Sequence, residues 1–408
     1  MAKEKEKSYS LTELAWKRLK KDKLSIFGLL VILLSAVVAI LGANIRPDST
    51  PDANDQILQL ATKKPGFTIP ILKVCKNNEE HHSNFFTRLF FGGEESEFTQ
   101  VPINRYHFID AEIVIEEYVG DNKPGPEKRF DLIDVVYPLS LTSTAVHRSG
   151  DNLSFYTYNN NQVTKSIKEL QAEIIKNNII EHKFYLGTDG RGRDMLSRLM
   201  AGSLVSLAVG FISVFISMFI GTAVGAIGGY FRGRVDDFII WLINVVWSIP
   251  TLLLVIAITL ALGKGFWQIF VAVGLTMWVE VARVVRGQFI SLREKEFVEA
   301  GRALGFTNFR IIFRHVLPNV IGPIIVIAAS DFASAIMMEA GLSFLGIGAQ
   351  PPMSSWGSMI KDNFGYIMTG KPYLTLIPGF AIMLMVLAFT LLGNGLRDAI
   401  DSKNTHKV

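Results

Sequence analysis

Residues Ser203–Phe231, SLVSLAVGFISVFISMFIGTAVGAIGGYF, form an apolar run that carries no charged side chain. About 20 apolar residues suffice for a helix to cross a hydrocarbon core that is roughly 30 Å thick. This stretch is longer than that, so we predict a membrane-spanning helix. The apolar share of the whole chain, 49%, would not decide the class, because soluble proteins share it.

Five further apolar runs predict five more spanning helices, which makes the chain an all-α membrane protein with six spans. The first run is too long for the apolar core of a signal peptide, so we expect a retained transmembrane helix. The five runs are Leu24–Ala43, Phe238–Leu262, about Gly265–Val285, about Asn319–Leu345 and Pro372–Leu396.

Lys and Arg gather on one side of these spans. They are frequent in residues 1–23, in Arg283–Pro318 and in the tail 397–408, and rare in the two short loops of the other side. The positive-inside rule therefore places both termini in the cytoplasm. Leu11, Leu14 and Trp16 recur at helical spacing in the N-terminal tail. They predict a short amphipathic helix that lies on the membrane face or packs on its own protein.

Residues 44–185 differ in composition and contain no run long enough to span. Ala111–Glu116 and Phe130–Val136 read as strands, and apolar residues at helical spacing over Ile167–Ile175 predict a helix. We expect a mixed α/β extracytoplasmic insert between the first two spans, long enough to bury its own core.

The lone cysteine and its histidine neighbours do not predict a metal site. Cys75, His81 and His82 match no common zinc spacing and lie among polar residues, so a solvated loop is the favoured interpretation. We expect no metal and no catalytic group on this chain.

A polar segment between two spans, at about 288–318, predicts a helical hairpin on the cytoplasmic side. Its first helix covers Ser291–Leu304, with Gly305 in the left-handed conformation that ends helices. Thr307 caps a second helix that Pro318 ends. Ala300 and Gly301 are small, which would let another protein approach closely. The alternative is a surface hairpin with packing duties alone.

This segment, EAGRALG at Glu299–Gly305, resembles the EAA loop of ABC importer permeases. Four other segments resemble signatures of the C-type permease subunit of dipeptide/oligopeptide ABC importers, across a core that we expect at 186–396. These are LGTDGRGRDMLSR at Leu186–Arg198, FRHVLPN at Phe313–Asn319, EAGLSFLG at Glu339–Gly346 and GLRDA at Gly395–Ala399.

The resemblance implies a type I importer permease that forms half of a pore in a bacterial cytoplasmic (inner) membrane. Its implied partners are a B-type permease subunit, two ATP-binding cassette ATPases, an extracytoplasmic solute-binding protein and a di- or oligopeptide substrate. ATP and Mg²⁺ would bind the ATPases, and neither a cofactor nor nucleic acid would bind this chain. The coupling positions that carry over are Glu299, Ala300, Gly301, Gly305 and Pro318.

Two observations bear on this implication. No G-x-x-x-x-G-K-[ST] phosphate loop occurs in the chain, which agrees with a motor on other subunits. Gly301, Leu204 and Glu280 depart from the family pattern, and the insert is unusual. The solute could therefore be a nickel chelate, a glutathione-like compound or a peptide antibiotic. An ATPase-independent channel or carrier and a membrane-tethered receptor are rival interpretations.

Ionisable residues inside the spans are functional candidates, because charge in lipid is costly. Glu280 and Arg283 are spaced to form an ion pair, which is favoured over the alternative that they line the pore and contact substrate. Asp331 is the best candidate for a pore-facing group, and Glu339 suits a gate or helix packing. The candidates for close packing without other function are Gly221, Gly225, Gly228 and Gly229. Ser248-Ile249-Pro250 should break the third span.

Overall fold

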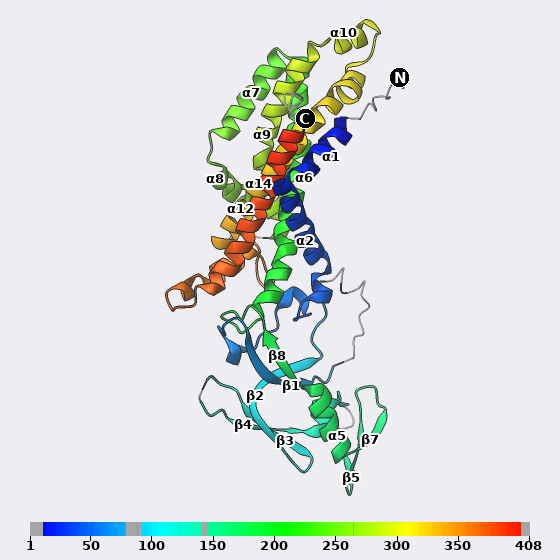
Figure 1. Cartoon of the computed structure of the whole chain (residues 1–408), viewed down its shortest axis with the longest axis vertical. Helices are drawn as coiled ribbons and strands as arrows, with labels where there is room; N and C mark the ends of the chain where they lie inside the picture. Colours follow the sequence, from blue (N-terminus) through cyan, green and yellow to red (C-terminus); the bar gives the residue numbers. More distant parts are fainter. Residues whose placement is uncertain are drawn as a thin grey trace, which may run out of the picture. The chain divides into compact units, whose positions relative to one another are not determined.

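The structure is a computed structural model that describes residues 11–78, 88, 92–121, 123–140, 146–263 and 265–400, with the backbone alone for 11–14. Two compact units emerge (Figure 1). The helical unit comprises Gly202–Lys361 with the described parts of Met1–Ala39 and Thr375–Val408. The sheet unit comprises the described parts of Ile40–Ala201 and also Asp362–Leu374, which lies outside the predicted insert.

Within the described ranges, five helices are long and apolar enough to cross a membrane. Each coincides with a predicted span, which confirms that a multi-pass membrane chain could be read from apolar run lengths. They are α2 (Lys23–Ile45), α6 (Met195–Phe231), α9 (Phe266–Arg293), the continuous helix Asn308–Phe344 that contains α12 (Leu317–Phe344), and α14 (Tyr373–Ile400).

The third predicted span is two helices, α7 (Arg234–Trp247) and α8 (Thr251–Leu262), which meet at 89°. The break falls at Ser248-Ile249-Pro250, where the sequence predicts one, since proline cannot donate the backbone hydrogen bond that would continue α7. By length and composition, the described residues therefore contain five helices that could span a membrane, or six candidate spans if this bent pair counts as one.

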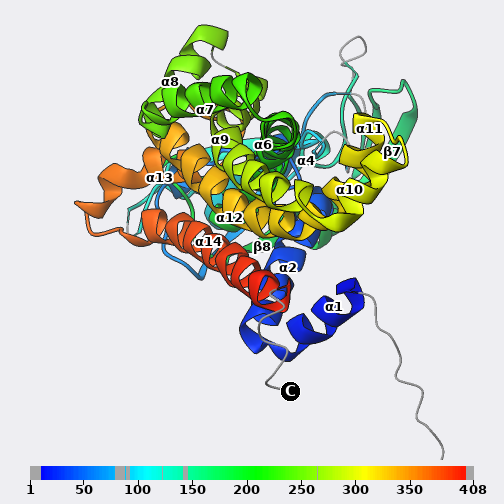
Figure 2. The ribbon, with the colours of Figure 1, turned by 90° about the horizontal axis from the view of Figure 1, so that it is seen from above.

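Helix α9 lies at the centre of the helical unit, with α6, α7 and α12 around it (Figure 2). Its contact with α6 is set by glycines. A Cβ on Gly225 would lie 2.5 Å from the Ala282 carbonyl oxygen, and one on Gly229 would lie 2.5 Å from Phe289 Cβ. Gly221 faces the same helix, whereas Gly228 faces α7. Close helix packing, as predicted, explains these glycines.

The sheet unit contains a five-stranded antiparallel sheet in the order β4-β3-β2-β1-β8 and a three-stranded sheet in the order β5-β6-β7. The strands are β1 (Phe67–Cys75), β2 (Phe98–Ile109), β3 (Glu112–Glu117), β4 (Glu127–Asp131), β5 (His147–Ser149), β6 (Asn152–Tyr156), β7 (Gln162–Ser166) and β8 (Ile179–Phe184). The core between them includes Leu72, Ile113, Leu132, Phe155 and Leu170. A mixed α/β domain is thus present.

One of the two predicted strands is correct. The strand predicted over Ala111–Glu116 is β3. The strand predicted over Phe130–Val136 is wrong after Asp131, because Leu132–Val136 forms the short helix α4. Leu132, Ile133 and Val135 are all buried, and a strand would have pointed adjacent residues to opposite faces. The predicted helix is α5 (Ile167–Glu173) with a π turn over Ile174–Asn178.

Candidate functional site

The segment between α9 and α12 folds as a hairpin over Glu296–Val316, called here the inter-span hairpin. It contains α10 (Glu296–Ala303), the short α11 (Asn308–Arg310) and a π turn over Ile311–Val316. Thr307 caps the second half, as predicted, since its side chain accepts a hydrogen bond from the Arg310 backbone N–H at 3.4 Å. The predicted first helix began too early, because Glu294 and Lys295 separate α9 from α10.

Gly305 ends α10 in the manner that the sequence predicts. Its φ is +75°, in the left-handed region that favours glycine. The Phe306 N–H donates to the Gly301 carbonyl at 3.0 Å and the Gly305 N–H to the Arg302 carbonyl at 2.9 Å. These two bonds define a Schellman motif, which satisfies the last carbonyls of the helix.

Pro318 does not end the second helix, contrary to the prediction. The helix runs from Asn308 to Phe344, and Pro318 lies at the start of α12, directly after the π turn. The Leu317 N–H donates to the Ile312 carbonyl, five residues back. This wider turn removes the α-helical geometry in which a proline ring strikes the carbonyl four residues earlier.

The base of the inter-span hairpin is fixed to the helical unit by a buried apolar cluster. Val298 and Ile311 pack with Tyr230 of α6 and Phe289 of α9. The Tyr230 hydroxyl also bonds Asn308 Oδ1 at 2.8 Å. These contacts fix the hairpin to α6 and α9.

Gly301 is buried, and a Cβ there would meet Phe306 and Ile311 at 3.4 and 3.8 Å. The prediction that its small size serves the approach of a partner is wrong, because Gly301 faces the hairpin's own interior. Glu299 and Ala300 are exposed, so they remain candidates for contact with another chain.

An exposed face of α10, beside the buried one, presents an apolar stripe. Phe297 is 42% exposed and Leu304 is 72% exposed, with exposed Ala300 between them. The spacing of three and four residues places all three on one face of the helix. We call Phe297, Ala300 and Leu304 the outer stripe of α10.

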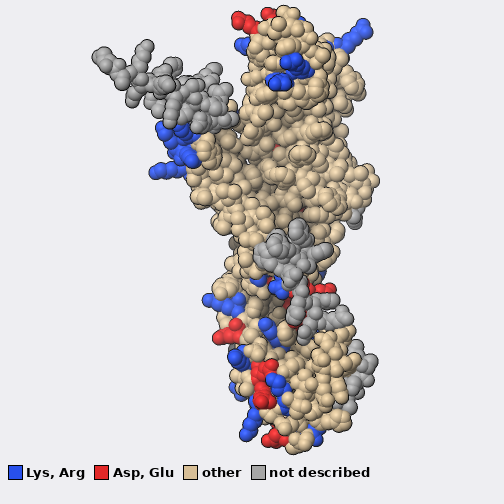
Figure 3. Space-filling view, turned by 90° about the vertical axis from the view of Figure 1, so that its right-hand side faces the viewer, with Lys and Arg blue, Asp and Glu red and all other residues tan. Residues whose placement is uncertain are grey.

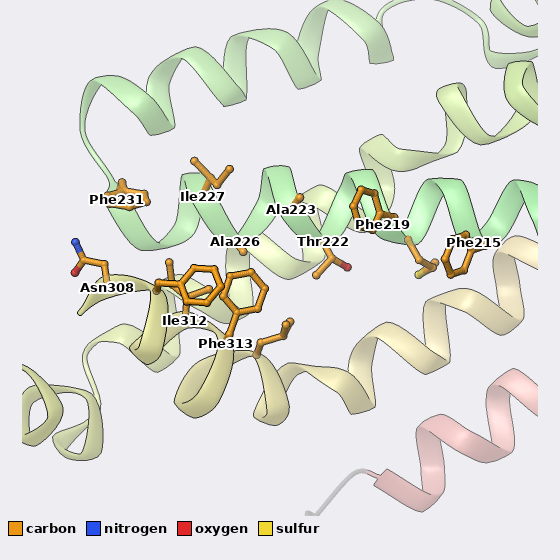
Figure 4. A pocket seen from close by; sticks show the side chains of 13 residues that line it. Phe215, Phe219, Thr222, Ala223, Ala226, Ile227, Phe231, Asn308, Ile312 and Phe313 are labelled. Carbon is orange, nitrogen blue, oxygen red and sulfur yellow. The ribbon is translucent and has the colours of Figure 1, made fainter. Parts of the chain in front are cut away.

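Beside the hairpin lies an apolar groove of about 650 Å³ between α6 and residues 308–317 (Figure 4). Its polar lining residues are Thr222 and Asn308. The remaining lining residues are Phe215, Met218, Phe219, Ala223, Ala226, Ile227, Phe231, Phe309, Ile312, Phe313 and Leu317. A surface of this kind suits apolar neighbours such as lipid tails or another helix.

The predicted pair of Glu280 with Arg283 is wrong. No ion pair joins these two described residues, and the Arg283 guanidinium carbon lies 3.0 Å from the centroid of the Trp247 ring. Glu280 is exposed on α9. An exposed carboxylate on a helix of this composition faces either water or another chain, so Glu280 keeps its standing as a candidate pore residue.

Asp331 and Glu339 are buried on α12 in different settings. Ser217 of α6 donates a long hydrogen bond to Asp331, at 3.5 Å. Glu339 is fully buried and accepts from Ser206 at 3.2 Å and from Ser343 at 2.7 Å. Ser355 bonds Ser343 in turn, at 3.2 Å. Glu339 therefore joins α6, α12 and the loop after α12, which suits the predicted packing role.

The sequence did not predict two sets of ionic contacts. In the helical unit, Arg286 donates two hydrogen bonds to the Asp236 carboxylate, of 2.5 and 2.8 Å. In the sheet unit, buried Asp189 binds Arg193 Nε at 2.6 Å and the Arg191 and Arg193 backbone N–H groups. The partners of the first pair are far apart in sequence, so no local pattern signals it. The second cluster explains the TDxxxR part of the Leu186–Arg198 signature.

His81 and His82, which follow Cys75 in the sequence, lie outside the described residues.

The apolar helices and the hairpin between two of them are compatible with a transport permease, and comparisons with known proteins show that class. Residues 217–406 match the family described as the binding-protein-dependent transport system inner membrane component. Residues 10–65 match the N-terminal TM domain of oligopeptide transport permease C.

Curated relatives narrow the class. A dipeptide transport system permease protein of Alkalihalophilus pseudofirmus is 44% identical over 55% of this chain and 72% of its own length. A glutathione transport system permease protein of Pectobacterium atrosepticum is 40% identical over 54% and 72%. The solved MetNI methionine ABC transporter is 20% identical, with a TM-score of 0.41, over 50% of this chain and 96% of that one. The chain belongs to the family of ABC transporter permease subunits of the dipeptide/oligopeptide C type.

Proposed function

We propose that this chain forms half of the translocation pore of a bacterial ABC importer for di- or oligopeptides. Its partners are a B-type permease subunit, two ATPases that bind ATP and Mg²⁺, and an extracytoplasmic solute-binding protein. The chain crosses the cytoplasmic membrane six times, with α7 and α8 as one broken span, and both termini face the cytoplasm. The sheet unit is the extracytoplasmic insert.

The outer stripe of α10 carries the coupling part of this proposal. A short helix that exposes Phe297 and Leu304 in a water-facing loop leaves apolar area uncovered, and a groove on a partner would cover it. The buried base of the hairpin transmits force, because Val298 and Ile311 pack against α6 and α9. A push on α10 by an ATPase therefore reaches the helices that line a pore.

The test is substitution of Leu304 by Asp in the assembled transporter. A charge in the middle of an apolar contact is expected to weaken it by at least 2 kcal/mol, roughly thirtyfold. The ATPases should be lost on purification, and peptide uptake should fall with them. The matched control is Ile175→Asp, on an apolar residue of the sheet unit that is 51% exposed. Retention of both ATPases and uptake by Leu304→Asp would contradict coupling through α10.

The substrate class needs its own experiment, because one relative is named for dipeptide transport and another for glutathione transport. Uptake of a labelled dipeptide into cells that express the complete transporter should be competed by unlabelled di- and oligopeptides. Competition by glutathione or by a nickel chelate alone would replace the peptide proposal with one of its alternatives. Uptake that persists without ATP would favour a channel or carrier.

A further inference from the structure

The N-terminal helix α1 (Leu11–Lys21) packs near the end of α14. Leu19 is buried, and Arg18 Nη1 donates to the Ala399 carbonyl at the end of α14, at 3.3 Å. Ser25, at the start of α2, bonds the Leu391 carbonyl at 3.0 Å. Helix α1 is thereby held where an apolar helix begins, which is where a membrane surface would lie.

The other side of α1 combines bare aromatic and basic groups. Trp16 is 48% exposed, and Lys20 Nζ lies 5.2 Å from the centroid of its ring. Lys21 and Lys23 are also exposed, and neither they nor Lys20 form an ion pair with a carboxylate in the described part of the chain. Figure 3 shows Lys and Arg gathered here, beside the uncharged flank of the helical unit.

Asp22, between Lys21 and Lys23, forms no ion pair with these lysines in the described part of the chain. Its carboxylate accepts hydrogen bonds from Ser25 Oγ and from the Leu24 backbone N–H, and so caps α2. The apolar surface continues directly past the charges, because Leu24 is 62% exposed and Phe27 is 47% exposed. The occupant of this side must therefore supply negative charge and hydrocarbon next to each other.

We propose that Lys20, Lys21 and Lys23, with Trp16, bind the phosphate headgroups of anionic lipids. Such a lipid presents phosphate at the depth of the lysines and acyl chains at the depth of Leu24 and Phe27. Tryptophan favours the interface between the two, and lysine reaches to phosphate from an apolar stem. Each basic residue near an anionic surface strengthens attraction about fivefold. This proposal does not depend on the transported solute.

The test titrates the purified full chain in detergent with phosphatidylglycerol or phosphatidylethanolamine, and counts bound lipids by native mass spectrometry. The native chain should prefer phosphatidylglycerol. Replacement of Lys20, Lys21 and Lys23 by Gln, which keeps helix propensity, should weaken phosphatidylglycerol binding between about tenfold and a hundredfold. Replacement of the same three by Arg should preserve it. Added salt should reduce the preference, because it screens exposed charges.

The matched control replaces three exposed lysines of the sheet unit, Lys64, Lys168 and Lys176, by Gln. This variant should bind phosphatidylglycerol as the native chain does. An equal loss in both triple variants, or none in the first, would overturn the proposal. If the first variant kept its lipids but lost a partner subunit when purified from cells that express the complete transporter, the occupant of this side would be that protein.

Discussion

At the residue scale, Glu339 shows what a carboxyl group does when hydroxyls rather than a cation surround it. Ser206 and Ser343 both donate to it in a site without exposure. Glu339→Leu should leave these hydroxyls unsatisfied and lower the free energy of unfolding by about 3 kcal/mol, whereas Glu339→Gln retains an acceptor and should cost about 1 kcal/mol. Thermal unfolding of the purified chain measures both. Equal midpoints for the two variants would contradict a role for the hydrogen bonds.

The Asp189 cluster makes a second residue-scale prediction. Asp189→Asn removes a buried charge that Arg193 needs, and should cost about 3–5 kcal/mol in the sheet unit. Asp110→Asn breaks the exposed pair with Arg148 and should leave the stability of the sheet unit almost unchanged, because water screens an exposed pair. Limited proteolysis of the sheet unit should therefore quicken in the first variant alone. Similar rates in both variants would show that the cluster contributes little.

The sequence predicted single polar candidates within the spans, but it did not predict which two side chains form a pair. Glu339 and Asp331 stand out because each interrupts an apolar run. Arg283 and Glu280 have the spacing of a pair, yet Arg283 lies over Trp247, which belongs to a different helix. Asp236 and Arg286 pair across helices, and the sequence contains no signal of which helices are neighbours.

At the element scale, helices were predicted by their apolar length, and their ends by glycine. Gly305 forms the expected Schellman motif. The helix end predicted at Pro318 is wrong. A proline stops an α-helix only if the preceding turn is α-helical, and the turn at Ile311–Val316 is a π turn. The strand predicted past Asp131 failed for a related reason, since a short run of apolar residues fits a buried helix as well as a strand.

Substitution of two glycines by alanine should change the stability of the helices in opposite directions. Gly225→Ala places a methyl group 2.5 Å from the Ala282 carbonyl oxygen and must push α6 from α9, at a cost of about 1–3 kcal/mol. Gly287→Ala, in α9, meets open space and should gain up to about 1 kcal/mol from helix propensity. Thermal midpoints of the two variants should move in opposite directions. A shift in the same direction would refute the packing argument.

For the molecule as a whole, composition separates the sheet unit from the spans. The sequence predicted only some of the segments that belong to the sheet unit. Asp362–Leu374 belongs to it through contacts that sequence order hides. The Tyr373 hydroxyl shares its proton between the carbonyl oxygens of Thr62 and Lys63, at 2.9 and 3.0 Å. Arg193 Nη2 lies 3.6 Å from Asp362 Oδ2. The loop before α14 is thus fixed to the insert, which the apolar runs could not indicate.

The number of spans decides on which side of the membrane α10 lies, and this gives the last prediction. With the N-terminus inside, α6 returns the chain to the cytoplasm. If α7 and α8 cross as one broken span, α9 brings α10 back to the cytoplasm, whereas a re-entrant pair would leave α10 outside.

Cys75 is the single cysteine, so Cys75→Ser with Leu304→Cys provides a unique thiol at a position that is 72% exposed. A membrane-impermeant maleimide should label this thiol only after permeabilisation, and should label native Cys75 in intact spheroplasts. Labelling of both thiols from outside would establish five spans and remove α10 from the reach of any cytoplasmic ATPase.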